Sequence, residues 1–311
     1  GDEPRAIAAA LGELVRRGGK RLRPALLAAA ARACGRGLDA AVVDAGCALE
    51  LLQAYFLVHD DWMDGDVTRR GGPAVHVVLA ARHHDEHLGA ALAVLAGDLG
   101  CALAHRVLIG IDASTRAEAM VSFARVHEEV VLGQALDLTL GAHDLAAVER
   151  MHALKTASYT SRGPVELGAI LAGASREARE ALDRFAAPVG VAFQLRDDLL
   201  GVFGTEAETG KPVGADLRAR KRTALVAEAI ARAADPQRVR LERMLEGGTP
   251  TDEDVTFAAD VIEGSGARAA IEARTSALLA EGRAALSTAP IADEGRVILD
   301  ALALALAERR A

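Results

Sequence analysis

Asp60, Asp61 and Asp64 form an acidic cluster at the end of a long apolar pattern, in the run His59-Asp60-Asp61-Trp62-Met63-Asp64. In an α-helix, Asp60 and Asp64 lie about 40° apart around the axis and ~6 Å apart along it, so they share a face. Two such charges ~5 Å apart repel by about 3 kcal/mol at an effective dielectric of 20. A divalent cation would turn this repulsion into binding, and oxygen-only ligands suit Mg²⁺. A solvated acidic helix end is the alternative for this cluster taken alone.

A second acidic pair, Asp197 and Asp198, lies inside a pattern that otherwise reads as core. Its apolar neighbours are Phe193, Leu195, Leu199, Leu200 and Val202. Buried carboxylates without partners are costly, so this pair needs partners. A metal shared with the first cluster would supply them. We therefore expect the two acidic groups to face each other across one helical-bundle cavity and to clamp a metal-bound diphosphate.

Basic residues accompany the acidic ones, although the chain as a whole is acidic. A compact basic loop begins the pattern at Gly18-Gly19-Lys20-Arg21-Leu22-Arg23-Pro24, and the others are Arg69, Arg70, Lys155, Lys211 and Lys221. Any one of these patches is ordinarily a solvated face. Five of them placed around two acidic clusters favour binding of a polyanion, which Arg contacts in bidentate fashion.

These motifs, in this order, resemble those of the trans-isoprenyl diphosphate synthases, the polyprenyl synthetase family. The resemblance runs from Gly19 to about Thr223. It consists of a Gly-Lys-x-x-Arg-Pro start, Asp-Asp-x-x-Asp followed by Arg-Arg-Gly, then Gly-Gln-x-x-Asp, Lys-Thr and Phe-Gln-x-x-Asp-Asp. It implies an all-α isoprenoid-synthase bundle around a central cavity. No break in the helical patterns separates two self-sufficient halves, so we expect a single domain over residues 1–311. It also implies a homodimer that uses three Mg²⁺ ions to join isopentenyl diphosphate to an allylic diphosphate.

The resemblance also implies a role for each matching residue. Asp60 and Asp64 would ligate two Mg²⁺ with Asp61 in support, and Asp197 would ligate the third with Asp198 nearby. The groups expected on the allylic diphosphate are Arg69, Lys155 and Lys211, with Lys221 close by. Those expected on isopentenyl diphosphate are Gly19, Lys20, Arg23, Gln53 and Arg70. Thr156, Gln194, Gln134 and Asp137 would line the reacting centre, although Gln134 and Asp137 read as polar surface without the resemblance.

One position departs from the family pattern. The second acidic motif usually ends in a third Asp, and here that position is Gly201. We expect the face that would carry the third carboxylate to be empty. Activity should survive if Asp197 is the main ligand, but an inactive subunit of a heteromeric synthase stays a rival interpretation.

Product length should depend on the depth of the cavity below the first acidic cluster. Tyr55 and Phe56 lie five and four residues before Asp60, so one turn below it they would form a floor that stops chain growth early. The resemblance to farnesyl diphosphate synthases with paired aromatics here predicts mainly a C15 product, with C20 as the alternative. Ordinary core packing is the other interpretation of the two rings.

A class I terpene cyclase is a further rival, because it shares the bundle and an aspartate-rich motif. It needs no isopentenyl diphosphate site and usually has an aromatic-rich pocket. The Gly-Lys-x-x-Arg-Pro segment and an aromatic content of 3% argue against it.

Helices must position all of these groups. Hydrophobic residues make up 51% of the 311 residues, so the chain folds, and many alanines with few aromatics favour helix over sheet. Sustained strand alternation is absent. The patterns predict helices over 38–64, 90–110, 114–140, 144–156 and 175–203, with Lys155 and Thr156 ending the fourth, and a loop over 204–220. Helices then resume, with breaks near 235–236, 247–250 and 289–290.

Composition excludes several classes. A net charge of −8 and a pI near 5.6 argue against a nucleic-acid binder. Cys34, Cys47 and Cys101 lack disulfide or zinc spacing, which favours a reducing, cytoplasmic location. The first 17 residues do not read as a signal peptide. The apolar stretch Gly89–Ile111 contains Asp98, His105 and Arg106, so we expect a buried helix rather than a membrane span.

Overall fold

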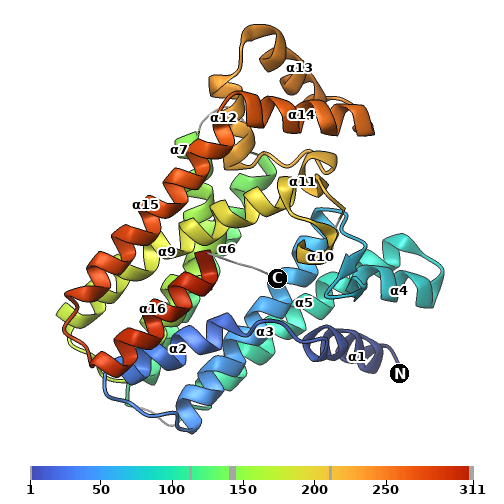
Figure 1. Cartoon of the computed structure of the whole chain (residues 1–311). Coiled ribbons are helices and arrows are strands. Elements are labelled where there is room, and N and C mark those ends of the chain that lie inside the picture. The colour runs from blue at the N-terminus through green and yellow to red at the C-terminus, as the bar shows by residue number, and fades with distance from the viewer. Residues whose placement is uncertain (1, 112–113, 140–144, 210–211, 308–311) are drawn as a thin grey trace. The chain divides into compact units, whose positions relative to one another are not determined.

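The computed structural model describes residues 2–111, 114–139, 145–209 and 212–307. Helices make up most of this part of the chain, and its one sheet is a hairpin of two short strands (Figure 1). The all-α prediction is confirmed. The chain divides into two compact units, Gly1–Ala124 with Glu166–Ala174, and Arg125–Val165 with Ser175–Ala311. The assignment of one domain to residues 1–311 stays a prediction.

The first unit holds the first acidic cluster. Its helices are α1 (Glu3–Arg16), α2 (Leu22–Ala33), α3 (Ala40–Met63), α4 (Val75–His83) and α5 (Glu86–Ile109), with the hairpin β1 (Thr68–Arg69) and β2 (Gly72–Pro73). The first part of α6 (Arg116–Thr139) and most of α8 (Gly163–Leu171) also belong to it.

The second unit holds the second acidic pair. It contains the rest of α6, α7 (Leu145–His152), the π-helix η1 (Ala153–Arg162), α9 (Arg176–Phe203), α10 (Glu206–Thr209) and α11 (Ala215–Arg218). The remaining helices are α12 (Ala224–Arg232), α13 (Asp235–Glu246), α14 (Asp252–Gly264), α15 (Ala267–Ser287) and α16 (Asp293–Ala307).

Local signals set the ends of the long helices. Asp39 caps α3 by accepting a hydrogen bond from the Val42 backbone N–H at 3.0 Å, and Ser175 caps α9 in the same way. Gly65 follows α3 with a φ of +70°, a conformation that glycine adopts without strain. The predicted ends of these two helices are therefore confirmed to within two residues.

The first unit is built on the packing of α3 against α5. Leu11, Leu14, Val58 and Leu79 are buried in its core. A Cβ on Gly97 of α5 would overlap the His59 ring of α3, so the glycine permits a close approach just before the acidic cluster. The acidic end of α3 is thus held by a tightly packed helix pair.

In the second unit, α9 packs against both η1 and α15. The π-helix is an uncommon element that occurs frequently at functional sites. Lys155 and Thr156 lie in its first turn, so the prediction that they end a helix is wrong. The π-helix follows α7 directly, so the chain stays helical through Lys155 and Thr156. No helix-ending residue such as glycine or proline occurs at these two positions.

The segment 204–220 is not only a loop. Within its described residues, 204–209 and 212–220, the chain forms the single-turn helices α10 and α11. Leu217 of α11 is completely buried in the core that also contains Leu199 and Val202 of α9. The glycines and the proline of this segment predict a loop. Burial of Leu217 nevertheless stabilises a helical turn there.

By length and composition alone, α3 and α5 would be long and apolar enough to cross a membrane. About half of the apolar window of α3 and a third of that of α5 is buried inside the protein. Two such helices are weak evidence for a membrane protein, since core helices of soluble proteins pass the same test.

Candidate active site

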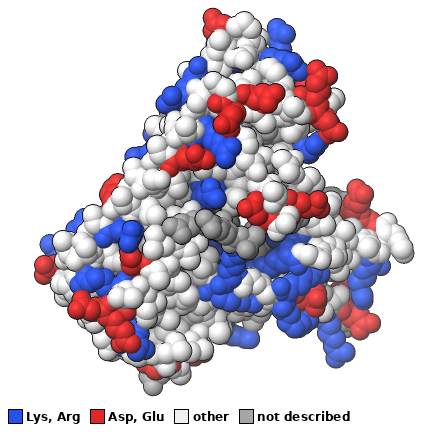
Figure 2. Space-filling view, viewed as in Figure 1, with Lys and Arg blue, Asp and Glu red and all other residues white. Residues whose placement is uncertain are grey.

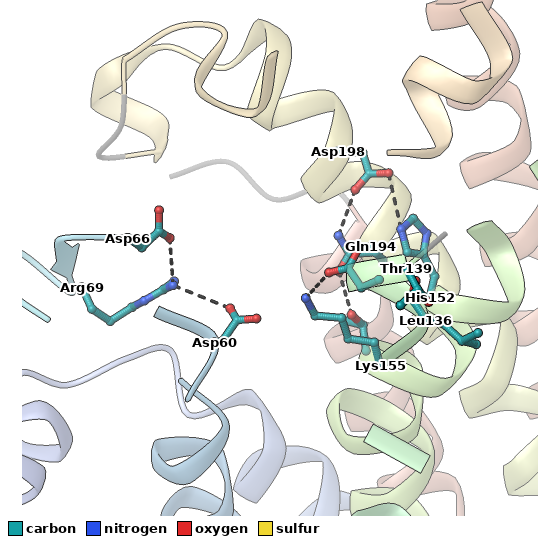
Figure 3. A network of polar contacts seen from close by, with 11 residues as sticks. Asp60, Asp66, Arg69, Leu136, Thr139, His152, Lys155, Gln194 and Asp198 are labelled. Atoms are coloured by element: carbon teal, nitrogen blue, oxygen red, sulfur yellow. Dashed lines mark hydrogen bonds and ion pairs between the residues drawn. The ribbon is translucent and has the colours of Figure 1, made fainter. Parts of the chain in front are cut away.

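Asp61 is the buried member of the first acidic cluster. It is completely buried, and Arg69 of β1 donates a hydrogen bond from Nε to its Oδ1 at 2.6 Å. Burial raises the pKa of Asp61 to about 6, and the Arg69 guanidinium opposes that rise. Arg69 also contacts Asp66 at 3.1 Å and Asp60 at 3.8 Å, as Figure 3 shows. One guanidinium thus contacts three carboxylates.

Asp60 and Asp64 are half-buried and differ in this from Asp61. The helix ends at Met63, and the backbone N–H of Asp64 still donates to the Asp60 carbonyl at 2.8 Å. The pair therefore keeps helical spacing at the carboxyl end of α3, where the helix dipole is negative. The helical periodicity predicts this difference, since it places Asp60 and Asp64 on one face of the helix and Asp61 on another.

The two-residue turn of the hairpin carries Arg70. Arg69 pairs with Gly72 across the strands, and Arg70 and Gly71 both have positive φ values, +52° and +70°. These angles are typical of a type I′ turn, which joins strands with a right-handed twist. The turn places Arg69 against the acidic end of α3 and Arg70 against the basic loop.

The basic loop approaches the hairpin through glycines. Nη2 of Arg70 lies 3.1 Å from the position of a Cβ on Gly19, and Arg70 donates to the Leu14 carbonyl at 3.3 Å. Arg17 lies against Gly72 in the same way and donates to the Pro73 carbonyl at 2.7 Å. Figure 2 shows Lys and Arg gathered on the visible face over this part of the first unit.

The remaining residues predicted to bind isopentenyl diphosphate lie in the same unit. Lys20 is exposed next to Arg21, which has a φ of +51° and forms an ion pair with Glu50 of α3. Arg23 lies in the first turn of α2, and Gln53 is half-buried on α3. The structure thus gathers the basic loop and Arg70 in one region, and Arg21 serves to anchor that loop.

A chain of hydrogen bonds links the second acidic pair to the π-helix. Thr156 donates from Oγ1 to Gln194 Oε1 at 2.9 Å, and Gln194 donates from Nε2 to Asp198 Oδ1 at 2.9 Å. The backbone N–H of Ala224 donates to Asp198 Oδ2 at 3.0 Å. We expected a metal to supply the partners of this carboxylate, but protein groups supply those of Asp198.

His152 completes the surroundings of Asp198. Its Nε2 lies 3.7 Å from Asp198 Oδ2, and Figure 3 shows the ring pointing at the carboxylate. Burial raises the pKa of Asp198 to about 7, against the hydrogen bonds from Gln194 and Ala224. Burial also lowers the pKa of His152 to about 4, so the imidazole is neutral near pH 7.

Lys155 forms an ion pair with Asp137 of α6. The absence of a side chain at Gly133 makes this possible, because a Cβ there would lie 2.6 Å from the Lys155 Cα. Gln134, next along α6, has a buried Nε2 for which the described residues provide no acceptor. Asp137 is therefore placed beside a predicted diphosphate ligand rather than on a plain polar surface.

Asp197 is half-buried on α9, next to Asp198. Lys221 follows α11, and its backbone N–H donates to the Asp216 carbonyl at 2.9 Å. Lys211 lies outside the described residues. The expectation of an empty face at Gly201 is wrong, because the Asp216 carboxylate fills the space that a side chain there would take.

Tyr55 and Phe56 pack together on α3, with ring centroids 4.9 Å apart. Tyr55 also contacts the His59 ring at 4.7 Å. Burial, followed by Cys101 and Asp98 of α5, raises the pKa of Tyr55. Tyr55 is thus directed toward α5, and the role of the two rings as a cavity floor stays a prediction.

Mg²⁺ takes oxygen ligands, and the carboxylates of both acidic groups are ligands of that kind. Among the described residues, no group of three or more His, Cys, Asp or Glu side chains is placed to hold a metal by itself. Mg²⁺ usually keeps several waters and takes only one or two carboxylates together with substrate phosphates. Asp60 with Asp64, and Asp197 on α9, fit that mode of binding. That both groups share one cavity stays a prediction from the sequence.

Several residues of these sites escaped the sequence interpretation. Asp66 could have been found, since it lies three residues before Arg69. Arg17, His152 and Asp216 had no such local signal, because each acts on a residue far along the chain.

The chain is similar to known proteins over most of its length. The sequence profile of the polyprenyl synthetase family matches residues 4–262. The chain is 36% identical over 300 residues to a (2E,6E)-farnesyl diphosphate synthase of Mycobacterium bovis, covering 94% of this chain and 80% of that protein. It is 37% identical over 235 residues to a farnesyl diphosphate synthase of Geobacillus stearothermophilus, covering 71% and 74%.

A solved structure shares the fold over nearly the whole chain. It is a geranylgeranyl pyrophosphate synthase from Corynebacterium glutamicum, complexed with isoprenyl diphosphate and magnesium. The TM-score is 0.92 at 37% identity, covering 98% of this chain and 90% of that one.

Proposed function

The chain belongs to the polyprenyl synthetase family and is an isoprenyl diphosphate synthase, and on that premise we propose that it makes mainly farnesyl diphosphate. The reaction is 1'-4 condensation of isopentenyl diphosphate with a shorter allylic diphosphate. Relatives named for both C15 and C20 products support the class, and geranylgeranyl diphosphate is the alternative product.

One observation carries this proposal. The two-residue turn of the hairpin joins the acidic end of α3 to the basic loop, through Arg69 on one side and Arg70 on the other. Carboxylates for a metal and guanidinium groups for a diphosphate therefore lie side by side in one unit. Binding of a metal-bound diphosphate needs both kinds of group.

We assign Asp60, Asp64 and Asp197 to Mg²⁺, with three ions in total. The magnesium-containing relative from Corynebacterium supports Mg²⁺ use. When bound, Mg²⁺ draws negative charge onto the diphosphate oxygens and so assists cleavage of the allylic C–O bond. Asp61 does not join these ligands, because its buried carboxylate is engaged by Arg69.

The protein's own groups stabilise the charge that develops on the leaving diphosphate. We propose that Lys155, Lys211 and Arg69 bind the allylic diphosphate, and that Lys20, Arg23 and Arg70 bind isopentenyl diphosphate. Fixed cations at a developing anion are usually the dominant contribution to such catalysis. Asp137 holds the Lys155 ammonium in place until substrate arrives.

Thr156 and Gln194 are proposed to line the reacting centre. Because Gln194 donates to Asp198 through Nε2, its Oε1 faces Thr156, so the amide has a single orientation. The alkene of isopentenyl diphosphate attacks the allylic cation, which forms the new C–C bond and leaves the positive charge on the branched carbon of the former alkene. Loss of a proton from the neighbouring carbon then forms the new double bond. The released diphosphate takes this proton, so the mechanism needs no dedicated side-chain base.

The test is a product assay on the purified protein. It is incubated with Mg²⁺, isopentenyl diphosphate and either dimethylallyl, geranyl or farnesyl diphosphate, and the products are sized after dephosphorylation. The proposal predicts a C15 alcohol from the two shorter starters. Release of a hydrocarbon from one allylic substrate alone would indicate a cyclase, and no turnover would indicate a non-catalytic subunit.

We also propose that the protein is a cytoplasmic homodimer that meets through α5. Leu88, Leu95 and Ile109 of α5 are 38%, 53% and 55% exposed, at helical spacing. Asp98 and Arg106 are exposed on the same helix. Burying both in hydrocarbon would cost several kcal/mol, so the exposed face of α5 suits a second protein subunit better than a lipid bilayer. Analytical ultracentrifugation of the protein and of Leu95→Asp tests this. Dimers should dissociate in Leu95→Asp, whereas Val297→Asp, at an exposed position of α16, should remain dimeric.

A further inference from the structure

The carboxyl end of α1 contacts both the hairpin and the basic loop. The last turn of an α-helix leaves carbonyl groups that have no partner within the helix. Here the Leu14 carbonyl accepts from Arg70 at 3.3 Å, and the Val15 carbonyl accepts from Arg21 at 2.9 Å. The helix dipole is negative at this end and favours such cations. The end of α1 therefore holds one arginine of the hairpin and one of the basic loop.

Arg17 makes the reciprocal contacts, from the end of α1 to the backbone of the hairpin. Its Nη1 donates to the Pro73 carbonyl at 2.7 Å and, more weakly, to the Arg69 carbonyl at 3.4 Å. These two carbonyls flank the turn that carries Arg70. The Arg17 side chain is only 17% exposed although it is charged. One guanidinium thus binds the backbone on both sides of the turn.

Gly72 provides the space that Arg17 occupies. A Cβ at position 72 would lie 2.6 Å from Nη1 and 2.7 Å from Nε of Arg17, which is too close for atoms that are not bonded. The φ of Gly72 is not positive, unlike that of Gly71, so the backbone conformation does not require glycine at position 72. The close approach of Arg17 does.

The two sides of the hairpin are held by different groups. The Arg69 side chain is fixed from α3, because it donates to the buried Asp61 carboxylate at 2.6 Å. The Arg70 guanidinium lies instead against the basic loop, with Nη2 at 3.1 Å from the position of a Cβ on Gly19. Loss of Arg17 should therefore displace Arg70 and leave the Arg69 side chain in place.

We propose that Arg17 is a positioning residue for the isopentenyl diphosphate site, which fixes Arg70 beside the basic loop. The inference rests on the proposed function, since that function assigns Arg70 and Lys20 to isopentenyl diphosphate. Arg17 acts through the backbone of the hairpin and does not itself bind the substrate. A guanidinium that is already held in place loses less conformational freedom when the diphosphate binds, so the affinity is higher.

The test compares Arg17→Ala, Gly72→Ala and the double variant with the unmodified protein. Gly72→Ala keeps the charge of Arg17, but its methyl group takes the place of the guanidinium. Arg16→Ala is the matched control, because Arg16 is the neighbouring, exposed arginine of α1 and pairs with Glu13. The readouts are the melting temperature, the dissociation constant of isopentenyl diphosphate by calorimetry without allylic substrate, and the KM of each substrate.

Arg17→Ala and Gly72→Ala should each weaken binding of isopentenyl diphosphate by about 3–10-fold, the loss expected when one long side chain is no longer held before binding. The KM of isopentenyl diphosphate should rise by the same factor, whereas the KM of the allylic diphosphate should stay nearly unchanged. The double variant should lose no more than either single variant, since both changes remove the same contact. Arg16→Ala should bind like the unmodified protein.

Binding of isopentenyl diphosphate by Gly72→Ala as tight as that by Arg16→Ala overturns the inference, even if Arg17→Ala does not fold. Losses that multiply in the double variant, or equal rises in both KM values, also overturn it, because they indicate a general structural role. A much larger loss in Arg17→Ala than in Gly72→Ala would make Arg17 a ligand rather than a positioning residue.

Calorimetry does not depend on the reaction, so the two proposals can fail separately. If the unmodified protein forms no prenyl product while the variants differ in binding as expected, the proposed function fails alone. If it is active and all variants bind isopentenyl diphosphate equally well, this inference fails alone.

Discussion

Gln194 donates a hydrogen bond to the buried carboxylate of Asp198, one turn further along α9, at 2.9 Å. Its carbonyl oxygen accepts a hydrogen bond from the Thr156 hydroxyl, so one amide bridges Asp198 and the π-helix. His152 lies on the other oxygen of the same carboxylate. Two buried titratable groups, Asp198 and His152, therefore lie next to Gln194 of the proposed reacting centre.

The two groups predict opposite effects of pH on stability. The pKa of Asp198 is raised to about 7 by burial, so between about pH 4 and 7 the folded state binds more protons than the unfolded state. Its contribution to the free energy of unfolding therefore falls as pH rises. The pKa of His152 is lowered to about 4 from an unfolded value of about 6.5, so its contribution rises with pH in that range.

Removing one group should uncover the pH dependence of the other. Asp198→Asn keeps the shape of the side chain, and inversion of the Gln194 amide lets each polar group keep a partner. Its free energy of unfolding should rise more steeply from pH 4.5 to 6.5 than that of the unmodified protein, by up to about 1.4 kcal/mol per pH unit. His152→Gln should change the slope in the opposite direction. Urea unfolding at several pH values measures both, and parallel curves for all three proteins would contradict the assignment.

Arg69→Ala should destabilise the protein by about 3–5 kcal/mol at pH 8, because it leaves the Asp61 carboxylate buried without its guanidinium. The loss should be smaller at pH 5, since the pKa of Asp61 is already raised to about 6 and loss of Arg69 raises it further. Adding Asp61→Asn should recover most of the loss. Arg82→Ala, which removes an exposed pair with Glu3, should cost at most about 1 kcal/mol in the same urea unfolding experiment. Equal losses for Arg69→Ala and Arg82→Ala would refute the buried pairing.

Gly190→Ala should destabilise the protein by about 1–3 kcal/mol through overpacking. Its new Cβ would lie 2.6 Å from the Cβ and 2.7 Å from the Cα of Ala157, at the contact of α9 with η1. Since η1 carries Thr156, turnover should fall as well. Gly264→Ala, with no atom within 4 Å of its new Cβ, is the matched control and should leave both quantities nearly unchanged. A Gly190→Ala protein as stable as the control would show that this contact is loose.

Tyr55→Ala combined with Phe56→Ala should shift the product from C15 toward C20 and longer chains. The two rings are in contact at 4.9 Å on the helix that carries Asp60, so their removal should open the path below the first acidic cluster. Phe257→Ala, which removes a ring stacked with Arg240 in the second unit, should leave the product unchanged. Chromatography of the dephosphorylated products distinguishes these outcomes, and an unaltered chain length in the double variant would exclude the floor.

The acidic and basic motifs are recognisable in the amino-acid sequence, and so are the long helices that carry them. Asp39 and Ser175 cap their helices through hydrogen bonds to residues three positions away, which are local by nature. The division of Asp61 from Asp60 and Asp64 also follows from the helical repeat. Where local signals were ambiguous, as in the glycine-rich segment 204–220, the burial of Leu217 prevailed over them.

The sequence by itself therefore determined the helical class, the ends of α3 and α9 and the kinds of group that the chemistry needs, because these depend on neighbours within a few residues. Only the tertiary structure decided which group meets which. Asp198 is bound by the backbone of Ala224, Gly19 lies under Arg70, and Asp216 fills the space above Gly201. Each of these contacts joins residues far apart in the chain. These contacts depend on how distant parts of the chain pack together, so the pattern of neighbouring residues does not predict them.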